Sequence, residues 1–491
     1  MSEENYDLAV VGAGLAGLSG ALRAAELGAR VVVFEAGAEQ KYLANSRFTG
    51  GVFHVAFKDI HSPVEVLERA IVSATGGFAD AALTRALAQD AGRAVDWLEA
   101  QGAVFGEGGA LEFMRCMLVP FSLREPGLAN HWPDRGADRL LARLEERLTD
   151  LGGQFVRGAR GRSLLMSDGQ CRGLEIERSD GRRETVSARA VLIADGGFQG
   201  NPELVRRHIS PRPEALCTRG AGTGKGDGLL MAEAVGAKLA HLDKFYGHVQ
   251  CAEALTDDAL WPYPILDIVA SAAIVVNSDG LRITDEGLGG VALANAIAAQ
   301  EDPLSTFVIM DEPIWEGAGR EFLLPPNPTL EERGVRIYRA PTLERLAERL
   351  GMPAQALAKT VNHYNAAVAT SRAASLQPPR TGQSSTLGRA PAMITTGPFM
   401  AIRLCAGITY TMGGIAIDAA GRVLDRNDSA IPGLYAAGSA TAGLEGGERS
   451  GYVGGLAKAL VFGLRAAERA VCEKTTRAPA NAGKSHATRG K

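Results

Sequence analysis

The feature that most constrains this chain is a glycine-rich segment, GAGLAG at residues 12–17, placed between an apolar run and a helical pattern. The run before it, residues 6–11, is rich in apolar and β-branched residues, as buried parallel strands are. Residues 15–27 have helical composition, and residues 30–34 (RVVVF) predict a second strand that ends beside Glu35. This order of strand, G-x-G-x-x-G, helix, strand and acid is the fingerprint of a dinucleotide-binding βαβ unit. It predicts an α/β fold of the Rossmann type.

Each part of the fingerprint has a physical task. Gly12 permits the tight turn, Gly14 lets the backbone approach a pyrophosphate, and Gly17 lets helix and strand pack closely. The unpaired N–H groups at the helix start favour phosphates, and Glu35 is placed to accept hydrogen bonds from ribose hydroxyls. We expect the dinucleotide to contact six residues of this unit: Gly12, Gly14, Ala16, Gly17, Glu35 and Ala36.

Composition narrows the class of protein. The 491 residues carry a net charge of -4, which gives no electrostatic footprint for nucleic acid. The six cysteines form no C-x-x-C pattern, so no iron–sulfur cluster, c-type haem or other metal site is predicted. An acidic start without a basic region argues against a secretory signal, and no apolar stretch reaches the roughly 20 residues that span a bilayer. We therefore predict a cytoplasmic protein without a transmembrane segment.

Five ordered segments resemble a known family. They are KYLANSRFTGGVF (41–53), VLIADGGFQGN (191–201), TRGAGTGKGDGLLMAEAVGAKL (218–239), TYTMGGIAID (409–418) and LYAAGSATAGLEGGERSGYVGGLAKALVFG (434–463). The set resembles the FAD-dependent flavoprotein subunits of fumarate reductase and succinate dehydrogenase, a family that includes 3-ketosteroid dehydrogenases. NSRFTGG and AGITYTMGG are similar to its tricarballylate dehydrogenase-like branch. The resemblance implies bound FAD.

The resemblance also implies a Rossmann-type FAD-binding domain that is split in sequence by an inserted α+β capping domain. We place the first FAD segment at 1–247, the capping domain at 248–405 and the second FAD segment at 406–472. The polar, basic residues 473–491 read as a disordered tail. Alternating patterns broken by Asp-Gly pairs predict antiparallel hairpins at 160–184 and in the cap around Asp279-Gly280, and helical patterns cover 343–350 and 354–370.

Further flavin contacts follow from the resemblance, position by position. They are Ser46, Thr49, Gly50, Gly51, Asp195, Gly196, Gly197, Thr223, Gly224, Asp227, Gly438, Ser439, Gly454, Gly455 and Leu456. Asp195 and Ser439 depart from the family pattern, which has a threonine and an acid there. Relatives that link FAD covalently carry a histidine where this chain has Asn45-Ser46-Arg47, so we expect non-covalent FAD and interpret His54 as a nearby polar residue.

The family's catalytic groups are partly missing. After the segment NSDGLRITDE no arginine follows until Arg320, so the family's proton-donating arginine is absent. The candidates that remain are Tyr410, Tyr452, Arg449 and His248. Each has a structural alternative: the tyrosines and the histidine as packed core residues, and the arginine in an ion pair with Glu445 or Glu448. Arg403, Arg115 and Arg124 are weaker candidates for anion binding.

The leading hypothesis is an FAD-dependent oxidoreductase that acts on a CH–CH bond beside a carboxylate or carbonyl, similar to tricarballylate dehydrogenase. Two alternatives stay open: a desaturase similar to 3-ketosteroid dehydrogenase, and a non-catalytic flavin-binding scaffold or maturation protein. The small-molecule substrate and the redox direction are not fixed by the sequence. Electrons must pass to or from a separate partner, either a membrane protein, a quinone or oxygen, because the chain carries no haem or cluster motif.

Overall fold

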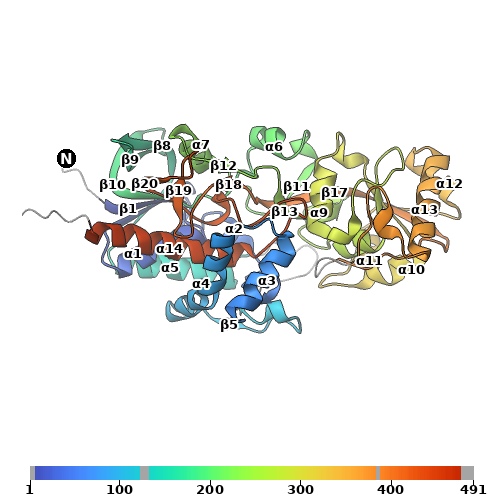
Figure 1. The fold of residues 1–491 in the computed structure, drawn as a ribbon, viewed down its shortest axis with the longest axis horizontal. Coiled ribbons are helices and arrows are strands. Elements are labelled where there is room, and N and C mark those ends of the chain that lie inside the picture. Colours follow the sequence, from blue (N-terminus) through green and yellow to red (C-terminus); the bar gives the residue numbers. More distant parts are fainter. Residues whose placement is uncertain (1–5, 122–131, 383–387, 477–491) are drawn as a thin grey trace, which may run out of the picture.

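The computed structural model describes residues 6–121, 132–382 and 388–476. The molecule is elongated (Figure 1): the sheet that contains β1 lies at one end, and helices α10 to α13 lie at the other. The described helices are α1 (Leu15–Glu26), α2 (Asn45–Phe48), α3 (Val64–Thr75), α4 (Ala81–Ala100), α5 (Gly136–Asp150), α6 (Pro202–His208), α7 (Asp227–Ala234), α8 (Asp267–Ala272), α9 (Gly290–Ala298), α10 (Glu312–Glu316), α11 (Pro326–Glu332), α12 (Leu343–Leu350), α13 (Ala354–Ala369) and α14 (Gly455–Thr476).

The first sheet is the predicted Rossmann-type sheet. Its strands are β1 (Tyr6–Val11), β2 (Val31–Glu35), β7 (Gln154–Arg157), β10 (Arg183–Ile193), β19 (Arg422–Leu424) and β20 (Ala430–Ala436). They run in the order β19-β20-β10-β1-β2-β7, with parallel pairing from β20 to β7. Helix α1 packs against both α5 and α14, so helices from distant parts of the chain cover one sheet. The apolar side chains of β1 and α1 are buried, and their packing holds α1 against the sheet.

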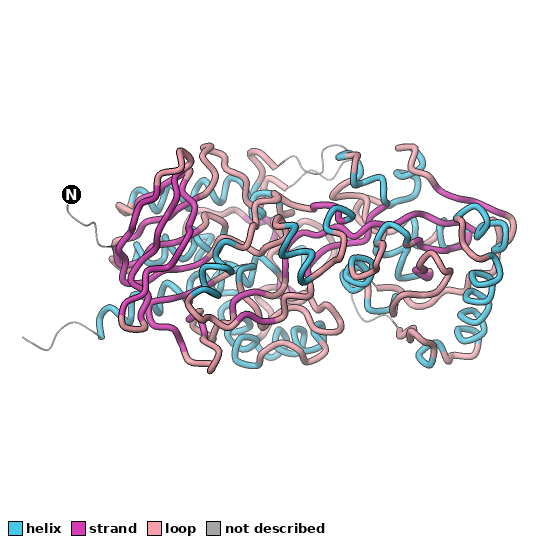
Figure 2. The backbone as a smooth tube through the Cα atoms, turned by 90° about the horizontal axis from the view of Figure 1, so that it is seen from above, coloured by secondary structure: helices cyan, strands magenta, loops and turns pink. Residues whose placement is uncertain are grey.

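An antiparallel extension grows from β10. Strands β8 (Ala159–Ser167) and β9 (Gln170–Arg178) pair with each other, and β9 pairs with β10, as Figure 2 shows for the magenta strands at this end. Asp168 and Gly169 both have positive φ, which a two-residue hairpin turn of the favoured hand requires. The hairpins predicted at 160–184 are therefore confirmed.

The second sheet belongs to the cap and is organised around one long strand, β17 (Phe399–Thr411). On it pair β11 (Leu216–Thr218), β13 (Phe245–Cys251), β15 (Phe307–Asp311) and β16 (Ile337–Ala340), while β14 (Ile274–Val276) pairs with β15. The other strands that the structure describes form short pairs: β3 (His54–Val55) with β4 (Lys58–Asp59), β5 (Phe105–Gly106) with β6 (Met117–Leu118), and β12 (Leu239–Ala240) with β18 (Gly414–Ile415). The predicted fold class, a split Rossmann-type domain with an inserted cap, is confirmed.

The structure adds detail at three expected segments. The proposed borders at 247/248 and 405/406 fall inside β13 and β17, which pair with each other, so this ribbon joins the expected cap to the first-sheet domain. Helix α14 continues to Thr476, four residues past the expected end at 472, because its helical pattern runs on; residues 477–491 lie outside the described part. The expected hairpin at Asp279-Gly280 forms and is short: Val276 bridges Arg282, and the Ile283 N–H donates to the Val275 carbonyl, while the longer partner of β14 is β15. Over the described residues, no helix combines the length and apolar character needed to cross a bilayer.

Candidate active site

The fingerprint residues line a cavity at the carboxyl ends of β1, β2 and β10, with a volume of about 450 Å³. We call it the nucleotide cavity. The predicted cofactor residues that line it are Gly12, Gly14, Ala16, Glu35, Ala36, Ser46, Asp195, Gly196, Thr223, Gly224, Asp227, Gly438 and Ser439. In open α/β sheets ligands bind at this edge, where parallel strands end and helices begin. The N-terminus of α1 therefore faces a space of the right kind for a dinucleotide.

The residues of this cavity fit a pyrophosphate and ribose. Gly12 has a φ of +94°, and a Cβ on Gly17 would lie 1.9 Å from the Gly12 carbonyl oxygen, so both positions require glycine. Glu35 accepts hydrogen bonds from the Ala13 and Gly37 N–H groups through its two carboxylate oxygens. Burial raises the pKa of Glu35 above its ordinary value. The two backbone hydrogen bonds hold its carboxylate at the wall of the nucleotide cavity.

Asp195 supplies a second sign that the cavity is built for a ligand. One carboxylate oxygen accepts the Gly228 N–H at 2.7 Å, and the other is buried with no partner among the described residues. Burial raises the pKa of Asp195 to about 7. An orphaned buried oxygen at the wall of a cavity is costly unless a ligand or water pairs with it. The nucleotide cavity thus fits the adenine dinucleotide that the fingerprint predicts.

A second cavity of about 270 Å³ adjoins the first. We call it the tyrosine cavity, because Tyr246, Tyr263, Tyr410 and Tyr452 line it. The two cavities share four lining residues: Asn45, Ser46, Ser439 and Ala459. Of the predicted flavin contacts, Thr49, Gly50, Gly455 and Leu456 line the tyrosine cavity. Because the two cavities adjoin at these shared residues, we expect a dinucleotide held by α1 to place its flavin end beside the tyrosines.

Helix α2 connects the two cavities. Ser46 Oγ accepts the Leu15 N–H at 3.0 Å, which ties α2 to the first turn of α1. Asn45 donates to the Thr409 carbonyl and accepts from the Ala221 N–H, both at 2.8 Å. In the sequence, Asn45 is notable only because it belongs to the segment where covalently flavinylated relatives have a histidine. Asn45 joins β17 to the 219–226 loop, while Ser46 makes the bond to α1, and the sequence shows neither of these long-range contacts locally.

Four predicted glycines shape the site without lining either cavity. They are Gly17, Gly51, Gly197 and Gly454. A Cβ on Gly197 would lie 2.1 Å from Thr411 Oγ1, and one on Gly454 would lie 2.3 Å from the His54 carbonyl oxygen. Both glycines therefore permit a close approach of backbone segments that frame the cavities.

Three tyrosines gather at the centre of the tyrosine cavity. The rings of Tyr246 and Tyr452 stack with centroids 4.0 Å apart, and Tyr410 lies 5.3 Å from Tyr246. Burial, reinforced by the nearby Glu445 carboxylate, raises the pKa of Tyr410 well above its ordinary value; burial raises the pKa of Tyr452 in the same way. Both phenols are therefore neutral at physiological pH and keep the proton that a hydrogen-bond donor needs. The structure brings the predicted Tyr410 and Tyr452 together, and it adds Tyr246.

A buried ion pair lies behind Tyr410. The Tyr410 hydroxyl donates to the Glu445 carboxylate at 3.0 Å, and Lys458 Nζ contacts the same carboxylate at 2.6 Å. Glu445 also accepts the Val453 N–H, which fixes the turn before α14. The expected alternative for Glu445 was an ion pair with Arg449. The structure instead buries Glu445 completely and gives it Lys458, from the first turns of α14, as its cation.

His248 is part of a second polar chain. Its Nδ1 lies 2.6 Å from an Asp267 carboxylate oxygen, and its Nε2 lies 3.0 Å from the Tyr246 hydroxyl. The other Asp267 oxygen accepts the Val249 N–H at 2.9 Å. Because the carboxylate accepts the Nδ1 proton, Nε2 is the acceptor for Tyr246. Burial lowers the pKa of His248, so the imidazole is neutral near pH 7.

Arg219 is the residue of the site that sequence reasoning missed most clearly. Its guanidinium lines the tyrosine cavity, donates to the Pro262 carbonyl at 3.0 Å and to Thr409 Oγ1 at 3.2 Å, and lies 5.6 Å from the Tyr263 ring centre. It stands in the segment TRGAGTGKGDG, and a basic residue inside a glycine-rich loop was the available signal. Among the described residues that line this cavity, Arg219 is the sole lysine or arginine, and none is an acid.

The remaining walls of the tyrosine cavity are largely apolar or aromatic. Their side chains come from both halves of the molecule: Phe48, Phe57, Phe113, Met114, Trp261, Ile265, Phe322 and Leu323. His54 also lines the cavity, and burial lowers its pKa to about 4, so it is a neutral, polar member of this wall. A cavity with one cation and many rings favours a flat, mostly apolar ligand with a single polar end.

The other candidate arginines do not reach this cavity. Arg449 is exposed and packs its aliphatic part beside Gly76, because the local turn directs it outward. Arg403 donates to the Leu304 carbonyl, and Arg115 pairs with Asp59. Arg124 lies outside the described residues.

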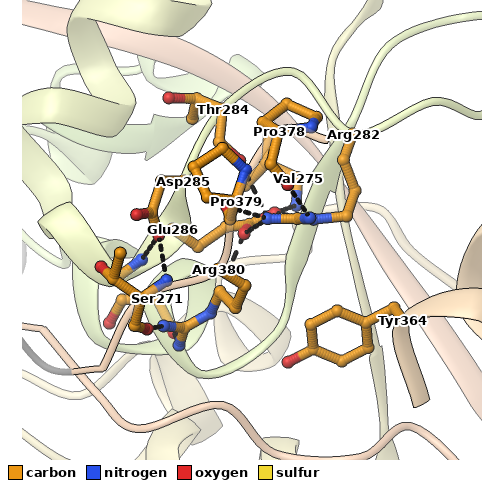
Figure 3. A network of polar contacts seen from close by, with 12 residues as sticks. Ser271, Val275, Arg282, Thr284, Asp285, Glu286, Tyr364, Pro378, Pro379 and Arg380 are labelled. Atoms are coloured by element: carbon orange, nitrogen blue, oxygen red, sulfur yellow. Dashed lines mark hydrogen bonds and ion pairs between the residues drawn. The ribbon is translucent and has the colours of Figure 1, made fainter. Parts of the chain in front are cut away.

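Two buried arginines of the cap hold the cap itself together (Figure 3). Arg282 and Arg380 both approach the buried Glu286 carboxylate, and both also donate to backbone carbonyls. Neither lines the nucleotide or tyrosine cavity. They therefore do not substitute for the family arginine that the sequence lacks.

Comparison with known proteins identifies the family. The family described as FAD binding domain matches residues 7–454. The chain belongs to this FAD-binding family. This flavoprotein is 28% identical over 481 residues to a probable fumarate reductase of Shewanella frigidimarina, covering 95% of this chain and 75% of the relative. It is 25% identical to a vinyl phenol reductase of Lactiplantibacillus plantarum, covering 90% and 91%.

The fold has relatives among solved structures. A 3-ketosteroid-Δ4-(5α)-dehydrogenase of Rhodococcus jostii superimposes with a TM-score of 0.70 at 23% identity, covering 96% of this chain and 98% of that one. With the family match and the curated relatives, the predicted family, the FAD cofactor and the oxidoreductase class are confirmed. The protein is an FAD-dependent oxidoreductase, and the scaffold alternative is not retained.

Proposed function

We propose that this flavoprotein oxidises or reduces a CH–CH bond beside a carbonyl or a single carboxylate in a ring-bearing or otherwise largely apolar substrate. Bound FAD supplies the hydride exchange, and the protein supplies a polarising group and a proton carrier. The observation that carries the proposal is the tyrosine cavity, where three neutral phenols and one guanidinium lie among aromatic walls at the end of the nucleotide cavity. Relatives named for the reduction of fumarate and vinyl phenol support the reaction class.

The residues divide the work by their chemistry. Tyr452, beside the start of α14, is suited to donate a hydrogen bond to a substrate carbonyl, because its raised pKa keeps it protonated. Arg219 is suited to hold a carboxylate or a carbonyl oxygen through the N–H groups that Pro262 and Thr409 leave free. The aromatic side chains exclude water and orient the carbon skeleton.

The tyrosine cavity has too few cationic side chains for a tricarballylate-like substrate. Three carboxylates need several cations, and Arg219 stands alone among the described lining residues while Arg449 lies outside. We therefore favour a substrate with one anionic or carbonyl end over a tricarboxylate. A ketosteroid-like substrate is the second candidate, which the apolar walls and the paired tyrosines favour.

The mode of FAD attachment and the electron partner are part of the proposal. We propose non-covalent FAD, since Asn45 and Ser46 are both engaged in hydrogen bonds where covalent relatives have a histidine. Electrons reach or leave the flavin through a separate partner, either a membrane protein, a quinone or oxygen. Denaturing the holoprotein should release the flavin into the supernatant; flavin that stays with the precipitated chain would contradict this assignment.

The test of the function is anaerobic flavin spectroscopy with defined probes. Oxidised holoprotein is mixed with 4-androstene-3,17-dione or tricarballylate, and chemically reduced holoprotein with fumarate, urocanate or a vinyl phenol. We expect a ring-bearing probe to bleach or restore the flavin absorbance faster than tricarballylate or fumarate. Arg219→Met should raise KM for carboxylate-bearing probes far more than for the steroid, while Arg403→Met, an exposed control, should change neither. A preference for tricarballylate would overturn the substrate assignment.

A further inference from the structure

A chain of hydrogen-bonded polar side chains begins at the cap helix α8 and ends in the tyrosine cavity. Asp267 is the first residue of α8, is completely buried, and points its carboxylate at β13. His248 and Tyr246 come next. They lie two positions apart on β13, and His248 Nε2 is 3.0 Å from the Tyr246 hydroxyl. Tyr246 and His248 both line the cavity, while Asp267 lies behind them. The order carboxylate, imidazole, hydroxyl is that of a nucleophile or base activated through histidine.

We propose that Tyr246 carries the substrate proton and that His248 and Asp267 form its relay; this rests on the proposed function. In the direction of desaturation, one substrate C–H bond breaks and its proton bonds to the Tyr246 oxygen, while the Tyr246 proton moves to His248 Nε2. The electron pair of that C–H bond becomes part of the new C=C bond, and the second hydrogen leaves as hydride to the flavin. In reduction, the same proton path runs backwards.

Three features make this path better than a lone tyrosine. The Tyr246 phenol is held neutral by burial, which raises its pKa, so it must pass on its own proton as it accepts another. His248 is unprotonated because burial lowers its pKa, so Nε2 has a free lone pair for that proton. Asp267, 2.6 Å from Nδ1, stabilises the imidazolium that forms. Asp267 is a positioning residue here, since it touches His248 and not the cavity.

Charged and titratable groups surround the relay. Among the described residues, those that face Tyr246 or His248 are Arg219, Asp267, Tyr263, Tyr410, Tyr452 and Glu445. Arg219 opposes protonation of His248, and Asp267 favours it. The family arginine acid is absent from this sequence, and the relay gives the tyrosine cavity a proton carrier through Tyr246 and His248, which line it.

The kinetic test uses the holoenzyme and whichever of 4-androstene-3,17-dione, fumarate, urocanate and a vinyl phenol the unmodified protein converts fastest. Tyr246→Phe and Asp267→Asn should each slow flavin reduction or reoxidation on the order of 10²–10⁴-fold with unchanged FAD content. The double variant should be no slower than the slower single variant, because the residues act as one unit. Tyr338→Phe, on β16 of the cap, is the control and should match the unmodified protein. Multiplied losses in the double variant would overturn the relay.

A second readout is independent of turnover. In protein labelled with 3-fluorotyrosine, the ¹⁹F resonance that disappears in Tyr246→Phe is assigned to Tyr246. Asp267→Asn should shift this resonance, because the Val249 N–H holds the amide oxygen and the amide NH2 then faces Nδ1. A donor in place of the acceptor of Nδ1–H changes the tautomer of His248. An unshifted resonance would overturn the relay. If no probe exchanges electrons with the flavin but the resonance moves, the relay stands and the proposed reaction class fails.

Discussion

At the scale of single residues, Glu445 and Lys458 form an ion pair that is buried behind the tyrosine cavity. Both side chains are almost completely buried, and Tyr410 donates to the same carboxylate. The attraction between buried charges offsets their desolvation only while both partners are present. Removing one partner therefore costs more than the pair contributes.

This asymmetry predicts the effect of Lys458→Met. The variant leaves Glu445 buried without a cation, which should destabilise the protein by about 3–5 kcal/mol, measured as a lower midpoint of denaturant unfolding of the holoprotein. The matched control is Lys238→Met, which breaks the exposed Lys238–Asp428 pair of the same 2.6 Å length and should cost at most about 1 kcal/mol. Adding Glu445→Gln to Lys458→Met should recover part of the loss. Equal effects of the two single variants would contradict the assignment.

Residue identity also explains which site residues the sequence could predict. Gly12 and Glu35, which line the nucleotide cavity, follow from the fingerprint of one βαβ unit, and Asp195 follows from the family resemblance by position. Tyr246 and Asp267 were not predicted, because their partnership depends on α8 packing against β13, and Asp267 lies 19 positions after His248 in the chain. Arg449 was assigned by motif register, and the turn that ends at Ser450 with a φ of +48° directs it away from the cavity. Motif register gives the segment, and local turn geometry decides where a side chain points.

At the scale of elements, local signals predicted the fold well. Strand β1 and helices α1, α12 and α13 appear within a residue of their expected bounds, because each has a period and an end signal in its own sequence. The sheet around β17 was not predicted, because its strands come from distant segments and pair through long-range contacts. The pairing of β13 with β17 across the proposed domain borders was not predicted for the same reason, because a boundary drawn in sequence does not show which strands pair.

The contact between α1 and the turn before it gives a prediction for Gly17→Ala. The added Cβ would lie 1.9 Å from the Gly12 carbonyl oxygen, so the helix start must move away from the turn that faces the pyrophosphate. We expect a lower flavin-to-protein ratio after purification and weaker FAD binding to apoprotein by fluorescence titration. Gly382→Ala is the control, since no described atom would lie within 4 Å of the added methyl group and the φ there is not left-handed. Unchanged FAD affinity in Gly17→Ala would contradict the assignment of the fingerprint to cofactor binding.

At the scale of the whole molecule, one buried core extends through both ends, yet the cavities occupy one end and the junction. Helices α12 and α13 lie at the far end of the elongated molecule, away from α1 (Figure 1). Ligand binding suppresses the local openings of the segments that it touches, and stability is not uniform across a structure. FAD should therefore protect the nucleotide cavity and leave the far end of the cap unchanged.

Hydrogen exchange followed by mass spectrometry tests this distribution on apoprotein and holoprotein. We expect FAD to slow exchange in peptides that cover residues 12–19, 194–199, 222–228 and 436–441, which contain lining residues of the nucleotide cavity. Peptides from 343–369 should exchange at the same rate with and without FAD, because α12 and α13 contribute no residue to either cavity. Equal slowing in both groups would mean that the β13–β17 ribbon couples cap and FAD domain into one cooperative unit. Slowing confined to the predicted peptides would instead show that FAD binding does not stabilise the far end of the cap, although the β13–β17 ribbon joins the two parts.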